Sequence, residues 1–322
     1  MIHVVEGLDI RGIVAAVPQQ VAKNLLIKSA ADVVRMIGVH ERRVADRDQH
    51  LQDFARPAAR HLLQQLGWGS DVDVLIVVTQ TPSQKAPAEA CRLQHALKLF
   101  TSCAAFDINL GCSGFTYGLW VMGRLLGRGQ RGLLVTGDLT RQYIDLSDRV
   151  TGYLFGDCIA VTAVERHALS GTDDAHFILG TDGSSASKLE IPVSPPVLRM
   201  DGAAVFQFTL RQVPAMYQSL FPATGDLGAN NVPDIVLLHQ ANAMIVKHLG
   251  QRMPAERGTP CNIERWGNTS SSSIPLLICD VLAHSLRTER LRVGMFGYGI
   301  GLSWAGVDMR LGPIKTLEIL EV

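Results

Sequence analysis

A cysteine between glycines is the residue of this chain best suited to covalent chemistry. Cys112 lies in NLGCSGF, after a strand-like run and before a helix-like one, so we expect it in the first turn of a helix that starts near Ser113. Unpaired N–H groups and the helix dipole favour a thiolate there. Flanking glycines allow a sharp turn, close approach of a substrate and N–H groups that face a developing oxyanion. The alternative is a small buried core residue, as free cysteines often are.

Two further polar residues follow apolar runs in the second half of the chain. His239 ends the strand-like IVLLH and is followed by Gln-Ala-Asn, and sites in α/β folds form at strand ends. Asn268 opens the hydroxyl-rich GNTSSSSIP, which would also serve as a helix cap. Lone histidines are more often structural than catalytic, so the functional interpretation depends on whether the fold brings His239, Asn268 and Cys112 together.

The two halves of the chain resemble each other in the order of their elements. Strand-like runs begin at Asp73 and Asp234, 161 residues apart, and each leads to a polar tetrapeptide (TQTP, HQAN) and a helix-like stretch. AFDINLGCSGF and CNIERWGNTSSSS then read as strand, glycine corner and helix, and RGLLVTGD and LRVGMFGYG supply one more strand each. We therefore predict two pseudo-equivalent α/β units, residues 1–165 and 166–322, that bring the three polar residues together. Residues 40–50 and 166–200, which interrupt this rhythm, are predicted as loops and connections.

Composition excludes several classes of function. The 322 residues include 30 basic and 30 acidic side chains, so we expect neither a nucleic-acid partner nor a membrane surface. The sequence shows neither an apolar run of membrane-spanning length nor a signal-peptide pattern, which predicts a cytoplasmic protein. No CxxC pair occurs and no histidine stands at a ligand-like spacing, so we predict no metal and assign packing roles to the other cysteines, Cys91, Cys103, Cys158, Cys261 and Cys279.

The three polar stretches together resemble the thiolase superfamily and, more narrowly, β-ketoacyl-acyl carrier protein synthase III. The resemblance spans nearly the whole chain: ERR after IGVH, AFDINLGCSGFTYGL, LFGD, LLHQAN, RWGNTSSSSIP and FGYGIGLSW occur in family order. It implies an α/β, thiolase-like fold with two pseudo-equivalent halves in a layered αβαβα core. It also implies a homodimer with the strand near residues 100–110 at the interface.

The resemblance implies an acyltransferase without a cofactor that performs a two-step Claisen condensation in fatty acid or specialised, polyketide-like biosynthesis. Cys112 would take an acyl group from an acyl-CoA or an acyl carrier protein, both phosphopantetheine thioesters. The N–H groups of Cys112 and of the loop near Gly299 would hold the oxyanion. His239 and Asn268 would then donate hydrogen bonds to the thioester carbonyl of malonyl carrier protein and stabilise the enolate formed by decarboxylation.

Departures from the family pattern concern the substrates. Ala86 stands where acetyl-CoA-specific members carry a large aromatic residue that reaches the partner's acyl pocket, so we predict an acyl donor longer or bulkier than acetyl. The tryptophan that stacks on the CoA adenine is missing near Asp32, although Arg149 retains a matching basic residue. The arginine after HQAN that helps dock the carrier protein is absent, with Met244 there and Lys247 one turn on. CoA is therefore expected to be a poorer acyl donor than a carrier-protein thioester.

Other functions stay open on the sequence alone. A relative that keeps Cys112 but passes the acyl group to a non-malonyl acceptor would not need Asn268. A non-catalytic partner subunit would be expected to lose Cys112, His239 or Asn268, and this chain keeps all three. A plain thiolase would need a second catalytic cysteine, which GMFGYGIGLSW lacks.

Overall fold

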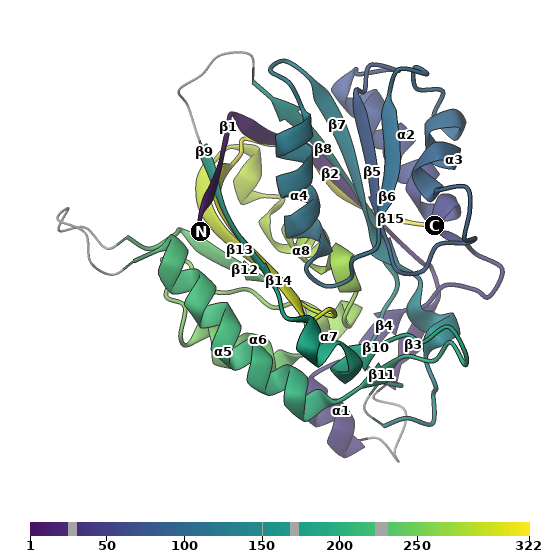
Figure 1. The fold of residues 1–322 in the computed structure, drawn as a ribbon, viewed down its shortest axis with the longest axis vertical. Helices are drawn as coiled ribbons and strands as arrows, with labels where there is room; N and C mark the ends of the chain where they lie inside the picture. The colour runs from purple at the N-terminus through teal and green to yellow at the C-terminus, as the bar shows by residue number, and fades with distance from the viewer. Residues whose placement is uncertain (25–30, 150, 168–173, 223–230) are drawn as a thin grey trace.

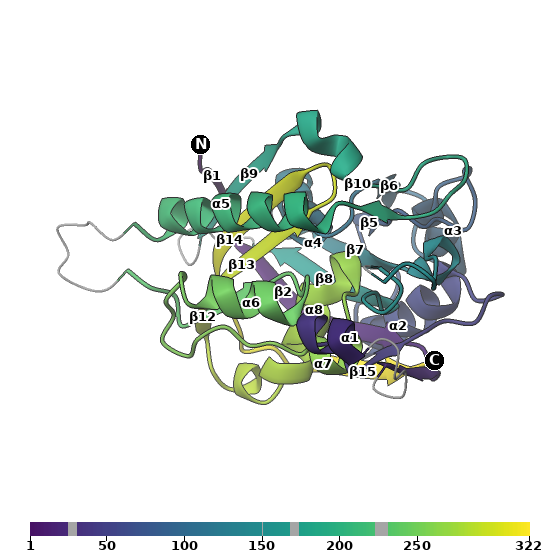
Figure 2. The ribbon, with the colours of Figure 1, turned by 90° about the horizontal axis from the view of Figure 1, so that it is seen from below.

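The fold consists of two β-sheets with helices between and outside them (Figure 1, Figure 2). It is seen in a computed structural model that describes residues 1–24, 31–149, 151–167, 174–222 and 231–322. The six-stranded sheet has the order β15 (Thr316–Glu321), β2 (Leu8–Val17), β8 (Cys158–Arg166), β7 (Arg131–Asp138), β5 (Val74–Val78) and β6 (Ala104–Ile108). The five-stranded sheet has the order β1 (His3–Glu6), β9 (Asp174–Thr181), β14 (Ser303–Leu311), β13 (Leu291–Gly299) and β12 (Ile235–Leu238).

The first and the last strand of the chain each pair in the sheet that is formed mainly by the other half of the chain. The change from one sheet to the other falls between β8 and β9, close to the boundary predicted at residue 165. However, β1 pairs with β9 in the second sheet, and β15 pairs with β2 in the first. Two short ribbons lie outside the sheets: β3 (Val21–Lys23) with β4 (Glu41–Arg43), and β10 (Leu189–Glu190) with β11 (Arg199–Met200).

Helices form three layers around the sheets. Outside the six-stranded sheet lie α2 (Leu51–Leu66) and α3 (Glu89–Ala96), and between the sheets lie α4 (Gly114–Leu125) and α8 (Ser273–Leu277). Outside the five-stranded sheet lie α5 (Gly202–Leu220) and, beside it, α6 (Ala243–Gly250), against which α1 (Ala31–Ile37) packs. The predicted αβαβα layering is therefore confirmed. None of the helices in the described ranges is long and apolar enough to cross a membrane.

The remaining helical segments are single turns that join the larger elements: α7 (Ile263–Trp266), the 3₁₀ turns η3 (Thr140–Tyr143), η4 (Gly183–Lys188), η5 (Ser270–Ser272) and η7 (Ser285–Arg287), and the π turn η6 (Ile278–Leu282). Because α7 and η5 flank Gly267, they form the corner that carries Asn268.

The strands β5 and β12 are apolar along their whole length because helices cover both faces of each sheet. All residues of β5 (VLIVV) and β12 (IVLL) are buried, which is typical of parallel strands inside an α/β fold. β5 runs parallel to β7, and β12 runs parallel to β13. Their carboxyl ends therefore bring Asp138, His239 and Gly299 to the same region between the sheets.

Residues 40–50 were predicted as a surface loop, and this prediction was wrong for the first part of the segment. Glu41–Arg43 form β4, and Arg42 is buried. Its guanidinium donates hydrogen bonds to the carbonyl oxygens of Gly152 at 2.9 Å and Phe155 at 3.3 Å. Those acceptors lie more than 100 residues away in the chain, so the local sequence gives no sign of them.

Two other local predictions were also wrong. The span 166–200, predicted as connections, contains β9, a full strand of the second sheet, while residues 168–173 lie outside the described ranges. Several β9 residues are only half-buried, which weakens the apolar signal of the strand. CNIERWG does not repeat the strand seen at β6, because Ile263–Trp266 form the helical turn α7.

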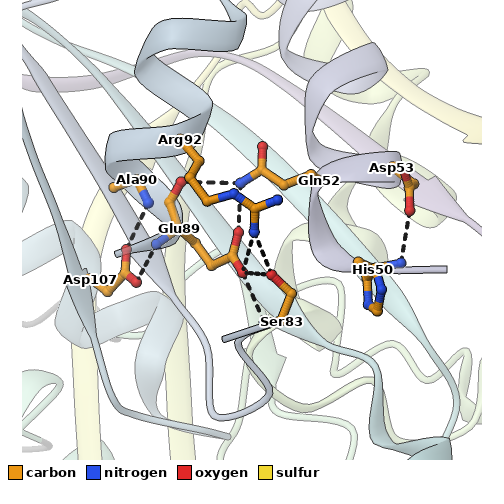
Figure 3. Close-up of polar contacts among 8 residues, drawn as sticks. All are labelled: His50, Gln52, Asp53, Ser83, Glu89, Ala90, Arg92 and Asp107. Carbon is orange, nitrogen blue, oxygen red and sulfur yellow. Dashed lines mark hydrogen bonds and ion pairs between the residues drawn. The ribbon is translucent and has the colours of Figure 1, made fainter. Parts of the chain in front are cut away.

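A buried carboxylate holds the segment that carries Ala86 (Figure 3). Glu89, the first residue of α3, has no exposed surface. It accepts hydrogen bonds from the Ser83 N–H at 2.8 Å, from the Ser83 hydroxyl and from Gln52 Nε2 at 2.6 Å. The half-exposed Arg92 guanidinium lies 3.5 Å from the same carboxylate. Ser83 before the turn that contains Ala86 and Glu89 after it are thereby bonded to each other, and Gln52 connects them to α2.

The same turn is tied to the edge strand β6. Asp107 accepts hydrogen bonds from the N–H groups of Glu89 at 2.7 Å and Ala90 at 2.8 Å, and so caps the start of α3. Burial raises the pKa of Glu89, but the hydrogen bonds from Ser83 and Gln52 outweigh that effect, and the pKa is lowered.

Glu89→Gln is expected to lower the free energy of unfolding by about 1–3 kcal/mol at pH 7, because several hydrogen bonds to a buried charge are weakened. The folded-state pKa lies below the unfolded value, so this contribution is present above the unfolded pKa and disappears as the pH falls through the folded pKa. Urea unfolding of both proteins between pH 7 and pH 3 measures the difference. Arg92→Gln, at the exposed end of the network, is the control and is expected to cost less than about 1 kcal/mol. A Glu89→Gln difference that is unchanged at pH 3 would contradict this account.

Candidate active site

Cys112 lies at the entrance to α4, close to the predicted position. Ser113 is the N-cap of α4 and Gly114 its first residue, so the thiol stands just before the first turn and not inside it. The Gly114 N–H donates to the Gly111 carbonyl at 2.6 Å, which closes the corner. A Cβ on Gly111 would lie 2.4 Å from Gln80 Oε1 and 2.7 Å from Ile300 Cγ2, so both side chains would have to move to admit a larger residue at this corner.

The resting Cys112 side chain is a neutral thiol. Only 9% of the residue is exposed, and burial together with the nearby Asp138 carboxylate raises the pKa of Cys112 to about 12. The N–H groups of Ile300 and Cys112 and the Ser270 side chain act in the opposite direction, but they do not outweigh burial. The thiolate predicted from the helix terminus is therefore not the resting form, because desolvation is the larger effect.

The loop after β13 packs directly against the thiol. Gly299 has φ of +154°, and a Cβ built on it would lie 2.8 Å from Cys112 Cβ and 2.9 Å from Sγ. Only glycine allows this approach. The N–H group that faces the sulfur belongs to Ile300, the residue after the predicted Gly299.

His239 lies at the end of β12 as a neutral, buried ring. Burial lowers the pKa of His239 to about 3. Nδ1 lies 2.7 Å from Ser273 Oγ, and that oxygen already accepts a hydrogen bond from the Gln240 N–H at 3.4 Å. The Ser273 hydroxyl can donate its proton to Nδ1, and in that arrangement the ring proton is on Nε2. His239 therefore presents an uncharged N–H donor.

Tyr298 connects the glycine loop to His239. Its hydroxyl donates to the His239 carbonyl at 3.0 Å, and the two rings meet edge to face with centroids 5.4 Å apart. Burial, with the Cys112 thiol nearby, raises the pKa of Tyr298 well above its usual value. Tyr298 thus positions His239 beside Gly299 without a charge of its own.

Asn268 and Ser270 complete the site. Asn268 Oδ1 accepts the Ser270 N–H at 2.9 Å, while Nδ2 makes only a long contact of 3.5 Å with the Ala241 carbonyl. Ser270 has φ of +52°, a conformation that non-glycine residues adopt rarely and that is enriched at functional sites. Its backbone lies against His239, and its side chain reaches Cys112. The three predicted residues, from three distant stretches, therefore meet around Ser270.

A narrow cavity of about 20 Å³ opens at Cys112, which is room for about one water molecule. Its polar lining includes Asp138, Ser270 and Gln80, and its apolar lining comprises Phe155, Leu189, Ile191, Leu198 and Ile300. The sequence analysis missed Asp138, although it ends the strand-like run RGLLVTGD just as His239 ends IVLLH. No sequence signal distinguishes Ser270 from the serines beside it.

The predicted substrate-binding residues lie outside this cavity. Ala86 is exposed in the turn before α3, and Lys247 is exposed on α6. The Arg149 guanidinium donates to both carboxylate oxygens of Asp32 at 2.8 Å, and these side chains are 61% and 65% exposed. Because α1 packs against α6, the Asp32–Arg149 pair lies on the same side of the molecule as α6.

Comparisons with known proteins agree with this geometry. Residues 106–183 match the family described as 3-oxoacyl-[acyl-carrier-protein (ACP)] synthase III, and residues 229–311 match its C-terminal part. A β-ketoacyl-[acyl-carrier-protein] synthase III from Geobacillus kaustophilus is 33% identical, with 95% of this chain and 99% of the relative covered. A solved 3-oxoacyl-(acyl-carrier protein) synthase from Burkholderia xenovorans superposes with a TM-score of 0.93 at 40% identity, covering 100% and 99% of the two chains. A priming β-ketosynthase of a polyketide pathway superposes with a TM-score of 0.81 at 25% identity, covering 96% and 97%.

Gly299→Ala is expected to disturb the thiol directly. The added methyl group would overlap Cys112 Sγ, so we expect a loss of about 1–3 kcal/mol in unfolding free energy. We also expect at least about fivefold slower alkylation of Cys112 by iodoacetamide, read by peptide mass mapping. Gly183→Ala is the matched control, because nothing lies within 4 Å of its added methyl group. Equal Cys112 alkylation in both variants would show that Gly299 does not pack on the sulfur.

Proposed function

This chain belongs to the 3-oxoacyl-[acyl-carrier-protein] synthase III family and is a condensing acyltransferase, and we propose that Cys112, His239 and Asn268 are its catalytic residues. The observation that carries this assignment is their convergence around Ser270 from three distant segments. Each presents the group that one part of a decarboxylative condensation requires: a thiol nucleophile, an uncharged N–H donor and an amide donor.

In the first half-reaction, the Cys112 sulfur attacks the thioester carbonyl of the acyl donor. A new carbon–sulfur bond forms, the bond to the leaving pantetheine sulfur breaks, and that sulfur leaves as a thiol after taking up a proton. The N–H groups of Cys112 and Ile300 face the sulfur, and we assign them to hold the oxyanion of the tetrahedral intermediate that forms beside it. Once the pantetheine thiol has left, the thioester carbonyl of malonyl carrier protein enters the site.

In the second half-reaction, His239 Nε2–H and Asn268 Nδ2–H donate to the thioester carbonyl of malonyl carrier protein. Loss of CO₂ leaves an enolate whose oxygen these two donors stabilise. The enolate carbon attacks the acyl group on Cys112, the β-ketoacyl thioester forms, and the Cys112 sulfur is released. The low pKa of His239 supports this role, because a neutral ring keeps its donor without taking a second proton.

Transfer to a non-malonyl acceptor is the alternative, and the Asn268 contacts argue against it. Asn268 Oδ1 is engaged with Ser270, whereas Nδ2 has only the long contact with Ala241. A purely structural asparagine would be expected to use its amide donor more fully. The available N–H is what an enolate requires.

We propose a carrier-protein thioester as the better acyl donor. The Asp32 carboxylate accepts two hydrogen bonds from Arg149 Nη2, so it neutralises part of the positive charge that would attract the nucleotide part of CoA. The exposed carboxylate would also repel CoA phosphates. The nearby Lys247 of α6 offers a positive charge to an acidic carrier protein.

We propose a cytoplasmic homodimer that pairs through the edge strand β6 and takes an acyl donor larger than acetyl. The outer edge of β6 carries no partner strand among the described residues, and its side chains are half-exposed. Unpaired edges of this kind favour association with a second copy. Asp107 ties the Ala86 turn to β6, so a dimer built there would bring Ala86 to the partner. A small residue at that place leaves more room for the acyl chain.

Intact-protein mass spectrometry tests the first half-reaction and the acyl chain length. We expect a stable acyl adduct on wild type and none on Cys112→Ser, formed fastest with donors longer than two carbons, and discharged by malonyl carrier protein. The panel comprises acyl-CoAs and acyl carrier proteins of two to twelve carbons. An adduct that malonyl carrier protein does not discharge would favour the alternative acceptor. Acetyl-CoA outcompeting every longer donor would refute the larger pocket.

Asp32→Ala is expected to improve the use of acyl-CoA without affecting acyl carrier protein. Freeing Arg149 and removing a negative charge is worth about 1 kcal/mol, or about a fivefold gain in kcat/KM for acyl-CoA. Asp71→Ala, which breaks the exposed Asp71–Arg131 pair elsewhere on the surface, is the matched control. An equal gain with acyl carrier protein, or none with acyl-CoA, would refute the assigned role of the Asp32–Arg149 pair.

A further inference from the structure

Acyl transfer leaves one proton unaccounted for, because Cys112 begins as a buried thiol. His239 is a poor acceptor for that proton, since burial lowers its pKa to about 3 and the Ser273 hydroxyl occupies Nδ1. Among the described residues that line the cavity at Cys112, Asp138 is the one with a carboxylate.

Asp138 ends β7 with both oxygens buried, and it uses them unequally. Oδ1 accepts hydrogen bonds from Thr79 Oγ1 at 3.0 Å, the Gln80 N–H at 2.6 Å and Thr81 Oγ1 at 3.3 Å. Oδ2 has no hydrogen-bond partner of standard geometry among the described residues, although it is fully buried. An unpaired buried carboxylate oxygen is costly, so its position beside a reactive cavity calls for a functional reason.

Ser270 lines the same cavity as this carboxylate and the thiol. Its side chain lowers the pKa of both Cys112 and Asp138, so it is close enough to act on each of them. The backbone of Ser270 is strained, with φ of +52°, and its N–H is held by Asn268 Oδ1 at 2.9 Å. A hydroxyl group both accepts and donates a hydrogen bond, so it can pass a proton between two groups that it contacts.

We propose that Asp138, acting through the Ser270 hydroxyl, accepts the proton of Cys112 during acyl transfer and returns it after condensation. The inference deepens the proposed function and rests on Cys112 as the nucleophile. Asp138 is a positioning and proton-holding residue, since it meets the reacting sulfur only through Ser270.

The protons gained and lost by Cys112, Ser270 and Asp138 balance over one turnover. As the Cys112 sulfur bonds to the acyl carbon, its proton moves to Ser270 Oγ while the Ser270 proton moves to Asp138 Oδ2. The leaving pantetheine thiolate takes a proton from solvent. When the enolate attacks the acyl group, the released Cys112 thiolate regains its proton from Asp138 by the reverse path. The acyl-enzyme therefore holds Asp138 neutral while the negatively charged malonyl group enters.

The groups that face Asp138 fit this role. Besides Cys112, two titratable neighbours face Asp138: Tyr143 of η3 and Cys158, which lies opposite Asp138 on β8. Burial and the Asp138 charge raise the pKa of Tyr143. Both are neutral at physiological pH, and burial raises the pKa of Asp138 itself. A carboxylate in this setting binds a proton more readily than one exposed to water.

Asp138→Asn tests the proposal, because the amide keeps an acceptor for Thr79, Gln80 and Thr81 but removes the proton acceptor. Single-turnover acylation of wild type is expected to level off above the pKa of Asp138. In the variant, acylation is expected to be about a hundredfold slower at pH 7 and to rise tenfold per pH unit from pH 7 to pH 9. Alkylation by iodoacetamide should change in the opposite direction, since the variant lacks the charge that raises the pKa of Cys112.

Two further variants separate a proton path from a structural effect. Ser270→Ala should give the same steep pH dependence with Asp138 intact, and it replaces Asp138→Asn if that variant fails to fold. Asp157→Asn removes a second buried carboxylate that lies outside the cavity and should keep the wild-type pH profile. Wild-type acylation rates in Asp138→Asn, or slower acylation without a change of slope, would overturn the proposal and leave the proposed function standing. A wild type that forms no acyl adduct would defeat the proposed function instead.

Discussion

A buried corner of hydroxyl groups between two apolar sheets is the feature on which the site depends. Residues 267–273 are all buried; the Thr269 and Ser271 hydroxyls have no hydrogen-bond partner among the described residues, whereas Ser272 and Ser273 are bonded to the two sheets. The Ser272 hydroxyl donates to the Thr136 carbonyl at 2.6 Å and accepts the Ala160 N–H at 3.2 Å, which ties the corner to the six-stranded sheet. Ser273 contacts His239 at the end of the other sheet. Because the same seven residues connect both sheets, they fix where the two sets of strand ends meet.

Burial also sets the charge state from which the chemistry begins. Desolvation raises the pKa of Cys112 to about 12 and lowers that of His239 to about 3, so the resting site holds neither a thiolate nor an imidazolium. A neutral histidine suits hydrogen-bond donation to an enolate. A neutral thiol, in contrast, needs a proton acceptor, and we propose Asp138 for this role because His239 must stay neutral to donate its N–H. In the proposed mechanism the two half-reactions therefore use different polar groups around one sulfur.

The sequence was sufficient to predict the layered fold and to single out the three residues that the structure brings together around Ser270, because each of these has a local signal. Gly111 marks the corner before Cys112, and the polar HQAN after an apolar strand marks His239. The structure adds that Asn242 of the same motif caps α6 through the Ile245 N–H at 2.8 Å. Ser270 and the buried Arg42 had no such signal, and Asp138 had only the strand-end position that it shares with His239. Their contacts lie far away in the chain, more than 100 residues for Arg42 and 57–59 residues for Asp138. For Ser270 the distinguishing feature is a backbone angle that the run of serines does not reveal.

The most direct test of the account separates the two half-reactions with Asn268→Asp. This change keeps Oδ1 as the acceptor for Ser270 but replaces the amide donor with a negative charge. Acyl adduct formation on Cys112 and CO₂ release from malonyl carrier protein are measured on the same sample. We predict adduct formation within about tenfold of wild type and CO₂ release lower by about 10²–10³-fold, the usual effect of losing one oxyanion donor. Equal losses in both steps, or CO₂ release at the wild-type rate, would contradict the assignment of Asn268 to the enolate.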